Sequence, residues 1–249
     1  MKISIITAFT EAFSYFNYSI PKRAQEKGKV DINLVNLLDY GLGKWKKIDD
    51  KPFGGGAGMV LRIEPLYRAL KDLVPNRFLG GQKQGDFIKP KFELPKISSK
   101  KDSLILLTSA RGEQWHQQYA ESYSLNVAHL IIICGHYEGV DNRITAFIDA
   151  EVSIGDFVLS GGELGAMVIA DSIIRLLEGV VGKKESVERE THFYKYYKDV
   201  EHPHYTRPGS FSTDEGLELK VPDILLSGHH AEIENWKKKN TKRIKKKKL

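Results

Sequence analysis

Two glycine-rich turns in the middle of the chain hold the residues best suited to bind a ligand. The first is Gly135–Asp141 (GHYEGVD), and the second lies within Ser153–Glu163 (SIGDFVLSGGE). Each follows a β-type run and opens into a helix-like segment. Because glycine lets the backbone approach a ligand with no side chain in the way, the pair indicates a pocket built from main-chain groups. Such a pocket suits a nucleoside-like molecule.

A third turn, Thr108–Gly112, follows the apolar run Leu104–Leu107 and is typical of a strand-to-helix connection. In open α/β sheets, ligands bind at the carboxyl ends of the strands, so we expect the three turns to converge on one site. Gly54–Gly58 is weaker evidence, because it lacks the lysine and hydroxyl of a phosphate-binding P-loop. A flexible turn would also explain it.

Strands and helices alternate along the chain, and these elements must position the turns. The alternation predicts an α/β fold with a mainly parallel sheet and helices on both faces. Strands are expected over 2–8, 30–37, 104–107, 130–133 and 152–159, and helices over 11–27, 63–74, 113–124, 140–147 and 163–178. Residues 76–102 break the rhythm and are expected to form a surface insertion.

Composition limits the class of protein. A chain of 249 residues fits one large domain, with or without a small appendage. The single cysteine, Cys134, excludes a disulfide framework and indicates a reducing compartment. The apolar run after Met1 is too short for a signal peptide or a membrane span, so a soluble, cytoplasmic protein is expected.

The net charge of +6 modestly favours a polyanionic partner, although much of it lies in the lysine-rich tail. A solvated, frayed end explains that tail equally well. Residues 163–178 form a helical segment that is apolar on nearly every side. Such a helix is buried in a core or an interface, and here it favours a dimer.

Five motifs follow one another along nearly the whole chain. Besides the two glycine turns, they are Asp49–Met59 (DDKPFGGGAGM), His204–Pro208 (HYTRP) and Leu225–Ile233 (LLSGHHAEI). In this order they resemble the bacterial tRNA (guanine-N1)-methyltransferases, which belong to the SPOUT class of S-adenosylmethionine enzymes. Given this resemblance, cofactor binding explains the glycines better than a role in turning the chain alone.

The resemblance implies a homodimer in which a deep C-terminal trefoil knot binds S-adenosylmethionine. The implied substrate is the guanosine 3′-adjacent to the tRNA anticodon. The implied organisation is a knotted methyltransferase domain over 1–182, a linker or lid over 183–205, and a small helical tRNA-binding domain over 206–249. The resemblance assigns cofactor binding to Ser109, Gly112, Gly135, Tyr137, Gly139, Ile154, Gly155, Asp156, Phe157, Val158, Leu159, Gly161 and Gly162.

Methylation of guanine N1 requires removal of its proton, which a carboxylate within hydrogen-bond reach can accept. A cation near guanine O6 would stabilise the developing charge. The family uses an aspartate as the proposed base and an arginine fifteen residues before it. Counting on from Arg175 reaches Glu190, so we predict Glu190 as the base and Arg175 as the O6 partner. Glu188 is a rival, and a solvated linker carboxylate is the plain alternative.

The third catalytic residue implied by the resemblance is Glu138, whose family counterpart lies near the reacting groups and helps to bind Mg²⁺. A turn residue making a local hydrogen bond is the alternative. The resemblance also assigns RNA binding to Asp50, Tyr205 and Arg207. Aromatic residues of the linker are expected to order over bound RNA as a lid, or else to pack the two units together.

The family usually continues well past the segment that matches residues 231–236, whereas this chain ends at Leu249 in a lysine run. The shortened unit is therefore expected to rely on non-specific charge, with a steep salt dependence of tRNA binding. Two alternatives to N1 methylation stay open. One is methylation of another RNA atom, and the other is an RNA-binding relative with little turnover.

Overall fold

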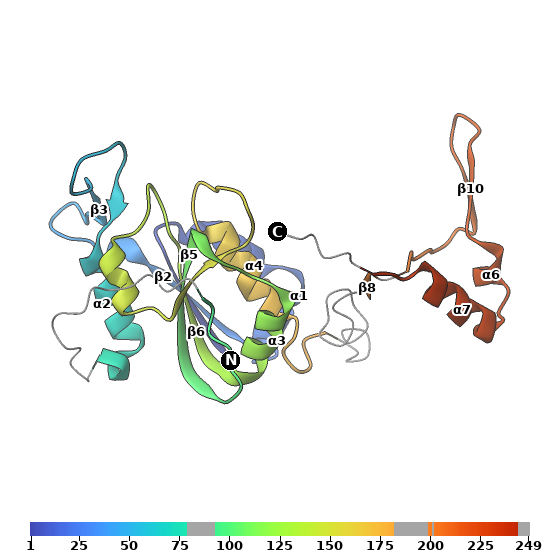
Figure 1. The fold of residues 1–249 in the computed structure, drawn as a ribbon, viewed down its shortest axis with the longest axis horizontal. Coiled ribbons are helices and arrows are strands. Elements are labelled where there is room, and N and C mark those ends of the chain that lie inside the picture. Colours follow the sequence, from blue (N-terminus) through green and yellow to red (C-terminus); the bar gives the residue numbers. More distant parts are fainter. Residues whose placement is uncertain (79–92, 182–198, 201, 244–249) are drawn as a thin grey trace. The chain divides into compact units, whose positions relative to one another are not determined.

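The computed structural model describes residues 1–78, 93–181, 199–200 and 202–243, and the chain forms two compact units (Figure 1). The larger unit is Met1–Gly182 and the smaller is Lys183–Leu249. Within the described residues, no helix combines the length and apolar character needed to cross a membrane.

The larger unit is built on a five-stranded sheet in which every neighbouring pair of strands is parallel. This confirms the predicted α/β class with a mainly parallel sheet. In sheet order the strands are β2 (Asp31–Asn36), β1 (Lys2–Thr7), β6 (Val127–Ile133), β5 (Lys101–Gln114) and β7 (Ala150–Ser153). Because all five run in one direction, their carboxyl ends lie along the same edge.

Helices cover both faces of the sheet, and alternate residues of the central strands divide between two cores. Ile105 and Leu107 face α2 (Ile63–Leu73), together with the short 3₁₀ helices η2 (Leu37–Tyr40) and η4 (Asn142–Ala146). Leu104 and Leu106 face the other core, which contains η1 (Thr10–Asn17), α1 (Ser19–Glu26), α3 (Gln117–Asn126) and α4 (Glu163–Ile174). Burial on both faces explains why these strands are continuous apolar runs.

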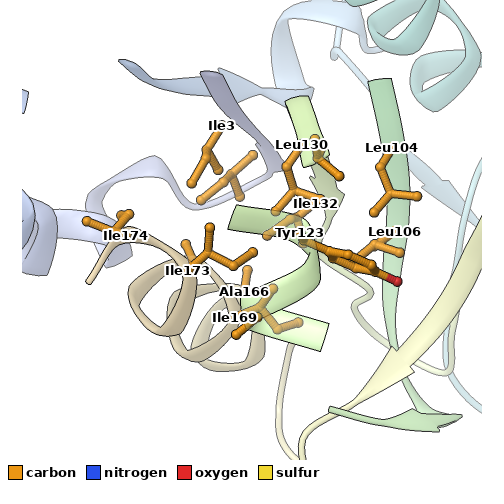
Figure 2. Packing of buried hydrophobic residues seen from close by; sticks show 14 of the residues in the cluster. Ile3, Leu104, Leu106, Tyr123, Leu130, Ile132, Ala166, Ile169, Ile173 and Ile174 are labelled. Atoms are coloured by element: carbon orange, nitrogen blue, oxygen red, sulfur yellow. The ribbon is translucent and has the colours of Figure 1, made fainter. Parts of the chain in front are cut away.

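Figure 2 shows how α4 packs on the sheet. Ala166, Ile169 and Ile173 of α4 point toward Ile3 of β1 and the leucine and isoleucine side chains of β6, and all are buried. Tyr123 of α3 fills the space beside Leu106 and is also fully buried. The N-terminus of α4 is thereby fixed at the carboxyl edge of the sheet.

Several predicted boundaries were wrong because long-range pairing overrides local pattern. The residues that follow Leu107 continue β5 as far as Gln114, where β5 pairs with β7, so Thr108–Gly112 is not a strand-to-helix turn. The helix expected from Glu113 begins only at Gln117. Likewise, β7 ends at Ser153 and not at residue 159.

Other predicted helices were interrupted or shortened. The helix expected over 11–27 is broken at Tyr18, since Pro21 has no N–H to continue the ladder. The segment 140–147 forms only the 3₁₀ helix η4, and α4 ends at Ile174. In the expected insertion over 76–102, η3 (Pro75–Phe78) and residues 93–100 are described, and Leu94 is buried in the core.

Two small elements complete the larger unit, and the smaller unit combines helices with a hairpin. In the larger unit, the two-residue strands β3 (Asp49–Asp50) and β4 (Val60–Leu61) pair antiparallel. The described elements of the smaller unit are β8 (Asp199–Val200), β9 (Ser210–Ser212), β10 (Glu218–Lys220), α6 (Asp223–Leu226), α7 (His230–Asn240) and β11 (Lys242–Arg243). The β9–β10 hairpin was not anticipated from the sequence.

Candidate active site

A cavity of about 460 Å³ lies at the carboxyl edge of the sheet. Its walls come from the three segments that the sequence singled out, namely the residues after Leu107 in β5, the turn after β6 and the segment after β7. Its volume is typical of a small-molecule binding site. The expected convergence of the three turns is therefore observed.

The first wall is a bulge within β5. Thr108 and Glu113 both pair with Val152 of β7, so the residues between them loop out of the ladder. Gly112 returns the chain to the sheet, because a Cβ atom at this position would lie 2.4 Å from the Val152 nitrogen. Ser109 and its two successors consequently reach the cavity.

The second wall is the turn Gly135–Gly139, which is hydrogen-bonded to both neighbouring walls. The Gly135 N–H donates to Thr108 Oγ1 (3.1 Å), and the Gly162 N–H donates to the Gly135 carbonyl (2.7 Å). Tyr137 has a φ of +59°, a left-handed conformation that is uncommon for a residue with a side chain. Backbone strain of this kind is concentrated at functional sites.

The third wall is the segment between β7 and α4. The Ser153 hydroxyl accepts from the Gly155 N–H (3.2 Å) and donates to the Gly155 carbonyl (3.0 Å), which turns the chain away from the sheet. Gly155 has a φ of +159°, and the Phe157 ring occupies the place of its missing Cβ atom. Phe157 and Val158 remain 54% and 86% exposed, so this wall presents apolar surface.

A charged pair lies in the cavity wall. The Arg111 guanidinium donates to both carboxylate oxygens of Glu151 (2.8 and 2.9 Å) and to Asn142 Oδ1 (3.1 Å). The Glu151 side chain is completely buried. This hydrogen bonding raises the pKa of Arg111, and the contact joins the β5 bulge to β7.

A second polar group lies beneath the two glycine turns. Thr7 Oγ1 donates to Glu163 Oε1 (2.8 Å), and His136 Nδ1 is 3.5 Å from Glu163 Oε2. The imidazole fills the space beside Gly161, where a Cβ atom would lie 2.3 Å from the ring. Burial, with the Glu163 charge, raises the pKa of the Cys134 thiol well above its ordinary value, so this thiol is not a nucleophile at neutral pH.

The loop between β3 and β4 is attached to the cavity by main-chain hydrogen bonds. The Glu138 N–H donates to the Met59 carbonyl (3.1 Å), and the Leu61 N–H donates to the Gly139 carbonyl (3.0 Å). The glutamate side chain lines the cavity and fills the space left by Gly58, where a Cβ atom would lie 2.4 Å from its Cγ. Among the described residues, no cluster of three or more His, Cys, Asp or Glu side chains is suited to a metal ion.

Most of the predicted cofactor-binding residues line the cavity: Ser109, Gly135, Tyr137, Gly139, Ile154, Gly155, Phe157, Val158, Leu159, Gly161 and Gly162. The predicted residues Gly112 and Asp156 do not line it. Glu138, one of the predicted catalytic residues, does.

The other predicted functional residues that the structure describes do not line this cavity. Arg175 follows the last residue of α4 and lies ten residues, about 15 Å along the axis, beyond Gly165, which lines the cavity. Glu190 and Glu188 lie outside the described residues, as do the aromatic residues of the linker. The Asp50 carboxylate pairs with Arg62 (3.0 Å). Tyr205 and Arg207 line a separate cavity of about 380 Å³ in the smaller unit.

Sequence reasoning missed the polar side chains that support the walls. Arg111 and Glu151 are forty residues apart, and Thr7 and Glu163 are separated by 156 residues. A buried glutamate in the apolar context of β7 was the one available signal. It indicates a paired charge, because an unpaired buried carboxylate would be too costly.

Comparisons with known proteins agree with this geometry. Residues 1–249 match the family described as tRNA (Guanine-1)-methyltransferase TrmD. A tRNA (guanine-N(1)-)-methyltransferase of Desulfitobacterium hafniense is 45% identical over 98% of this chain and 80% of the relative. One from Clostridium beijerinckii is 42% identical over 99% of this chain and 90% of the relative.

A solved structure shows the same fold. The crystal structure of tRNA (m1G37) methyltransferase from Aquifex aeolicus matches with a TM-score of 0.68 and 34% sequence identity. The match covers 95% of this chain and 87% of that chain. The sequence motifs, the cavity at the carboxyl edge and these relatives lead to one conclusion: the chain belongs to the tRNA (guanine-1)-methyltransferase family.

Proposed function

We propose that this protein transfers a methyl group from S-adenosylmethionine to N1 of the guanosine 3′-adjacent to the tRNA anticodon. The observation that carries the proposal is the cavity of about 460 Å³ at the carboxyl edge, two walls of which are the glycine motifs on which the family resemblance rests. The relatives carry the activity in their names, and they match almost the whole of this chain.

The residues around the cavity fit this cofactor. Apolar surface from Ile154, Phe157 and Leu159 suits an adenine ring, and the glycine turns bring main-chain polar groups to the same wall. When bound, S-adenosylmethionine would supply an electrophilic methyl group on a sulfonium centre. The protein's own contribution is to hold both reactants in line, which can provide much of the rate.

Removal of the N1 proton is the step that the protein must perform itself. We assign it to Glu190, a carboxylate in place of the family's aspartate, with Glu188 as the rival. Glu138 lines the cavity, which supports a role in contacting the target base or, with substrate oxygens, a Mg²⁺ ion. Arg175 would stabilise negative charge at guanine O6.

The position of Arg175 bears on the oligomeric state. Since about 15 Å of α4 separates it from Gly165 in the cavity of its own chain, we infer that it acts in the site of a second copy. Leu164 and Val168 on α4 are about half exposed, and Phe157 and Val158 in the segment that precedes α4 are exposed too. This apolar surface supports a homodimer. A monomer in light scattering would contradict it.

The remaining assignments follow the same scheme. We propose that residues 1–182 form the knotted methyltransferase domain, 183–205 the linker, and 206–249 a tRNA-binding domain. Tyr205 at the end of the linker and Arg207 at the start of that domain contact RNA. Because Asp50 already pairs with Arg62, an RNA contact there would involve both side chains. A cytoplasmic location fits an enzyme that modifies tRNA.

Methyl transfer to two matched tRNA transcripts tests the proposed function. One transcript carries guanosine at the target position and the other carries adenosine there. Only the transcript with guanosine should be methylated. Equal labelling of both would favour another target atom, and labelling of neither would favour a binding protein.

Glu190→Gln tests the assignment of the base. It should abolish turnover while cofactor affinity, measured by calorimetry, changes less than about threefold, because the amide keeps the shape but cannot accept the proton. Glu188→Gln is the matched control and should retain activity. Near-normal turnover of Glu190→Gln would overturn the assignment.

A further inference from the structure

The turn Gly43–Lys47 presents a tryptophan to solvent. Trp45 is 80% exposed, although tryptophan is on average among the most buried residues. An exposed indole offers water a large rigid ring face with an N–H at its edge, and both features can serve recognition. Neither the cavity nor the predicted catalytic residues account for it.

The backbone holds this turn in one conformation. Leu42 and Lys47 exchange two main-chain hydrogen bonds (2.8 and 3.0 Å), and the Lys46 N–H donates to the Gly43 carbonyl (3.2 Å). Gly43 and Lys46 both have positive φ angles, +67° and +48°. At Gly41 a Cβ atom would lie 2.2 Å from the Lys46 oxygen, so this position excludes a side chain. The indole is therefore displayed by a defined turn.

The turn that carries the indole is rich in lysine. The Lys44 ammonium lies 5.7 Å from the centre of the ring, and Lys46 and Lys47, which follow Trp45 in the turn, are exposed. Lys46 pairs with Asp39 at 3.4 Å, but both side chains are more than half exposed, so solvent screens the pair. Aromatic side chains next to lysines bind single-stranded nucleic acid, because bases stack on the ring and phosphates meet the charge.

The turn is connected to the candidate active site. The Arg62 N–H donates to the Ile48 carbonyl (2.8 Å), and Leu61, the residue before Arg62, is hydrogen-bonded to Gly139 of the cavity wall. Figure 1 shows the loops around β3 and the segment that precedes α4 at the same, upper edge of the sheet. The turn and the cavity therefore belong to the same edge of the larger unit, the edge along which a bound polynucleotide would extend.

We propose that Trp45 stacks on an unpaired nucleotide of the tRNA substrate, while Lys44 and Lys47 contact the flanking phosphates. This inference rests on the proposed function, because it extends the RNA-binding surface of the same site. The sequence motifs did not include Trp45. A second copy of the chain or a partner protein is the competing occupant of this surface.

Binding of a fluorescently labelled anticodon stem-loop by the full-length protein tests the proposal. Trp45→Ala should raise the Kd about tenfold, equivalent to about 1.4 kcal/mol, whereas Trp45→Phe should stay within about threefold. Leu125→Ala is the matched control, since this exposed residue lies just before β6, at the opposite edge of the sheet, and its Kd should be unchanged. An unchanged Kd for Trp45→Ala would overturn the proposal.

Two further readouts separate the occupants. Unlabelled stem-loop should quench a component of the tryptophan fluorescence that is missing in Trp45→Phe; equal quenching in both proteins would refute stacking. Lys44→Gln with Lys47→Gln should reduce the slope of log Kd against log salt concentration. A change in sedimentation of Trp45→Ala with no change in RNA affinity would assign the turn to a protein contact instead.

Wild-type protein is assayed for methyl transfer in the same experiment. If wild type methylates tRNA and Trp45→Ala binds it normally, only the stacking inference fails. If wild type neither binds nor methylates tRNA, the proposed function itself fails.

Discussion

Gly162→Ala tests whether close main-chain packing builds the cavity. Gly162 has φ and ψ of −82° and −4°, which alanine adopts readily, so any effect must come from lack of space. The new methyl carbon would lie 1.9 Å from Thr108 Oγ1 and 2.8 Å from the Gly135 nitrogen. One of these groups must move.

The expected cost follows from what those groups do. Overpacking a filled site costs about 1–3 kcal/mol. Displacing the Thr108 hydroxyl also weakens its hydrogen bonds to the Ile133 carbonyl (3.1 Å) and from the Gly135 N–H (3.1 Å), each worth about 0.5–1.5 kcal/mol. We therefore expect Gly162→Ala to lower the free energy of unfolding by about 3 kcal/mol.

Gly165→Ala provides the matched control, since Gly165 lies in α4, the helix that Gly162 caps. A Cβ atom there makes only ordinary contacts, the nearest at 3.6 Å to Thr108 Cγ2, so alanine should stabilise the helix by about 0.5–1 kcal/mol. The two substitutions are chemically identical but are predicted to have opposite signs. Denaturant titration of both variants measures the difference.

A double-mutant cycle identifies the clash. Thr108→Ala removes the hydroxyl that the new methyl group meets, so the double variant should be more stable than the sum of the single effects by at least about 1 kcal/mol. If Gly162→Ala unfolds within about 0.5 kcal/mol of wild type, or if the two effects simply add, the packing argument is refuted.

Three other predictions concern the charged residues and the cavity wall. Arg111→Met should cost about 3 kcal/mol of stability, because it leaves the buried Glu151 carboxylate without this partner. The double variant Arg111→Met with Glu151→Met should regain most of the lost stability. A loss below about 1 kcal/mol for Arg111→Met in denaturant titration would contradict this. Burial would raise the pKa of Asp149, but hydrogen bonds from Arg77, the Ile105 N–H and Lys101 outweigh it and lower that pKa. A carboxyl whose pKa is lower in the folded than in the unfolded chain stabilises the protein at a pH above its unfolded-state pKa, which is near 4. The wild type should therefore be more stable than Asp149→Asn at pH 5–7, and this advantage should shrink as the pH falls below about 4. A difference in unfolding free energy that does not change with pH would refute the argument. Phe157→Ala should weaken S-adenosylmethionine binding about tenfold in calorimetry with little change in stability, and unchanged affinity would remove Phe157 from the proposed pocket.

The central sheet could be predicted because its strands are buried on both faces. Leu104–Leu107 and Leu130–Ile133 are uninterrupted apolar runs, and this pattern is local. The extension of β5 to Gln114 could not be predicted, because its polar residues become strand only by pairing with β7. Pro21, by contrast, was a visible reason to break the predicted helix over 11–27.

The cavity could be predicted from its glycines, because a position packed closely against a neighbouring backbone admits only glycine, and the glycines are visible in the sequence. The supporting pairs could not, because nothing local connects Arg111 with Glu151 or Thr7 with Glu163. The knot stays a prediction from the family resemblance, because the threading of a chain has no local sequence pattern. Catalysis by Glu190 also stays a prediction.

The most direct test of the account is the identity of the modified nucleoside. A tRNA transcript is incubated with the protein and S-adenosylmethionine carrying an isotope-labelled methyl group, digested to nucleosides and analysed by mass spectrometry. The account predicts label in N1-methylguanosine, derived only from the position 3′-adjacent to the anticodon. Label in any other nucleoside, or an unlabelled tRNA, would contradict it.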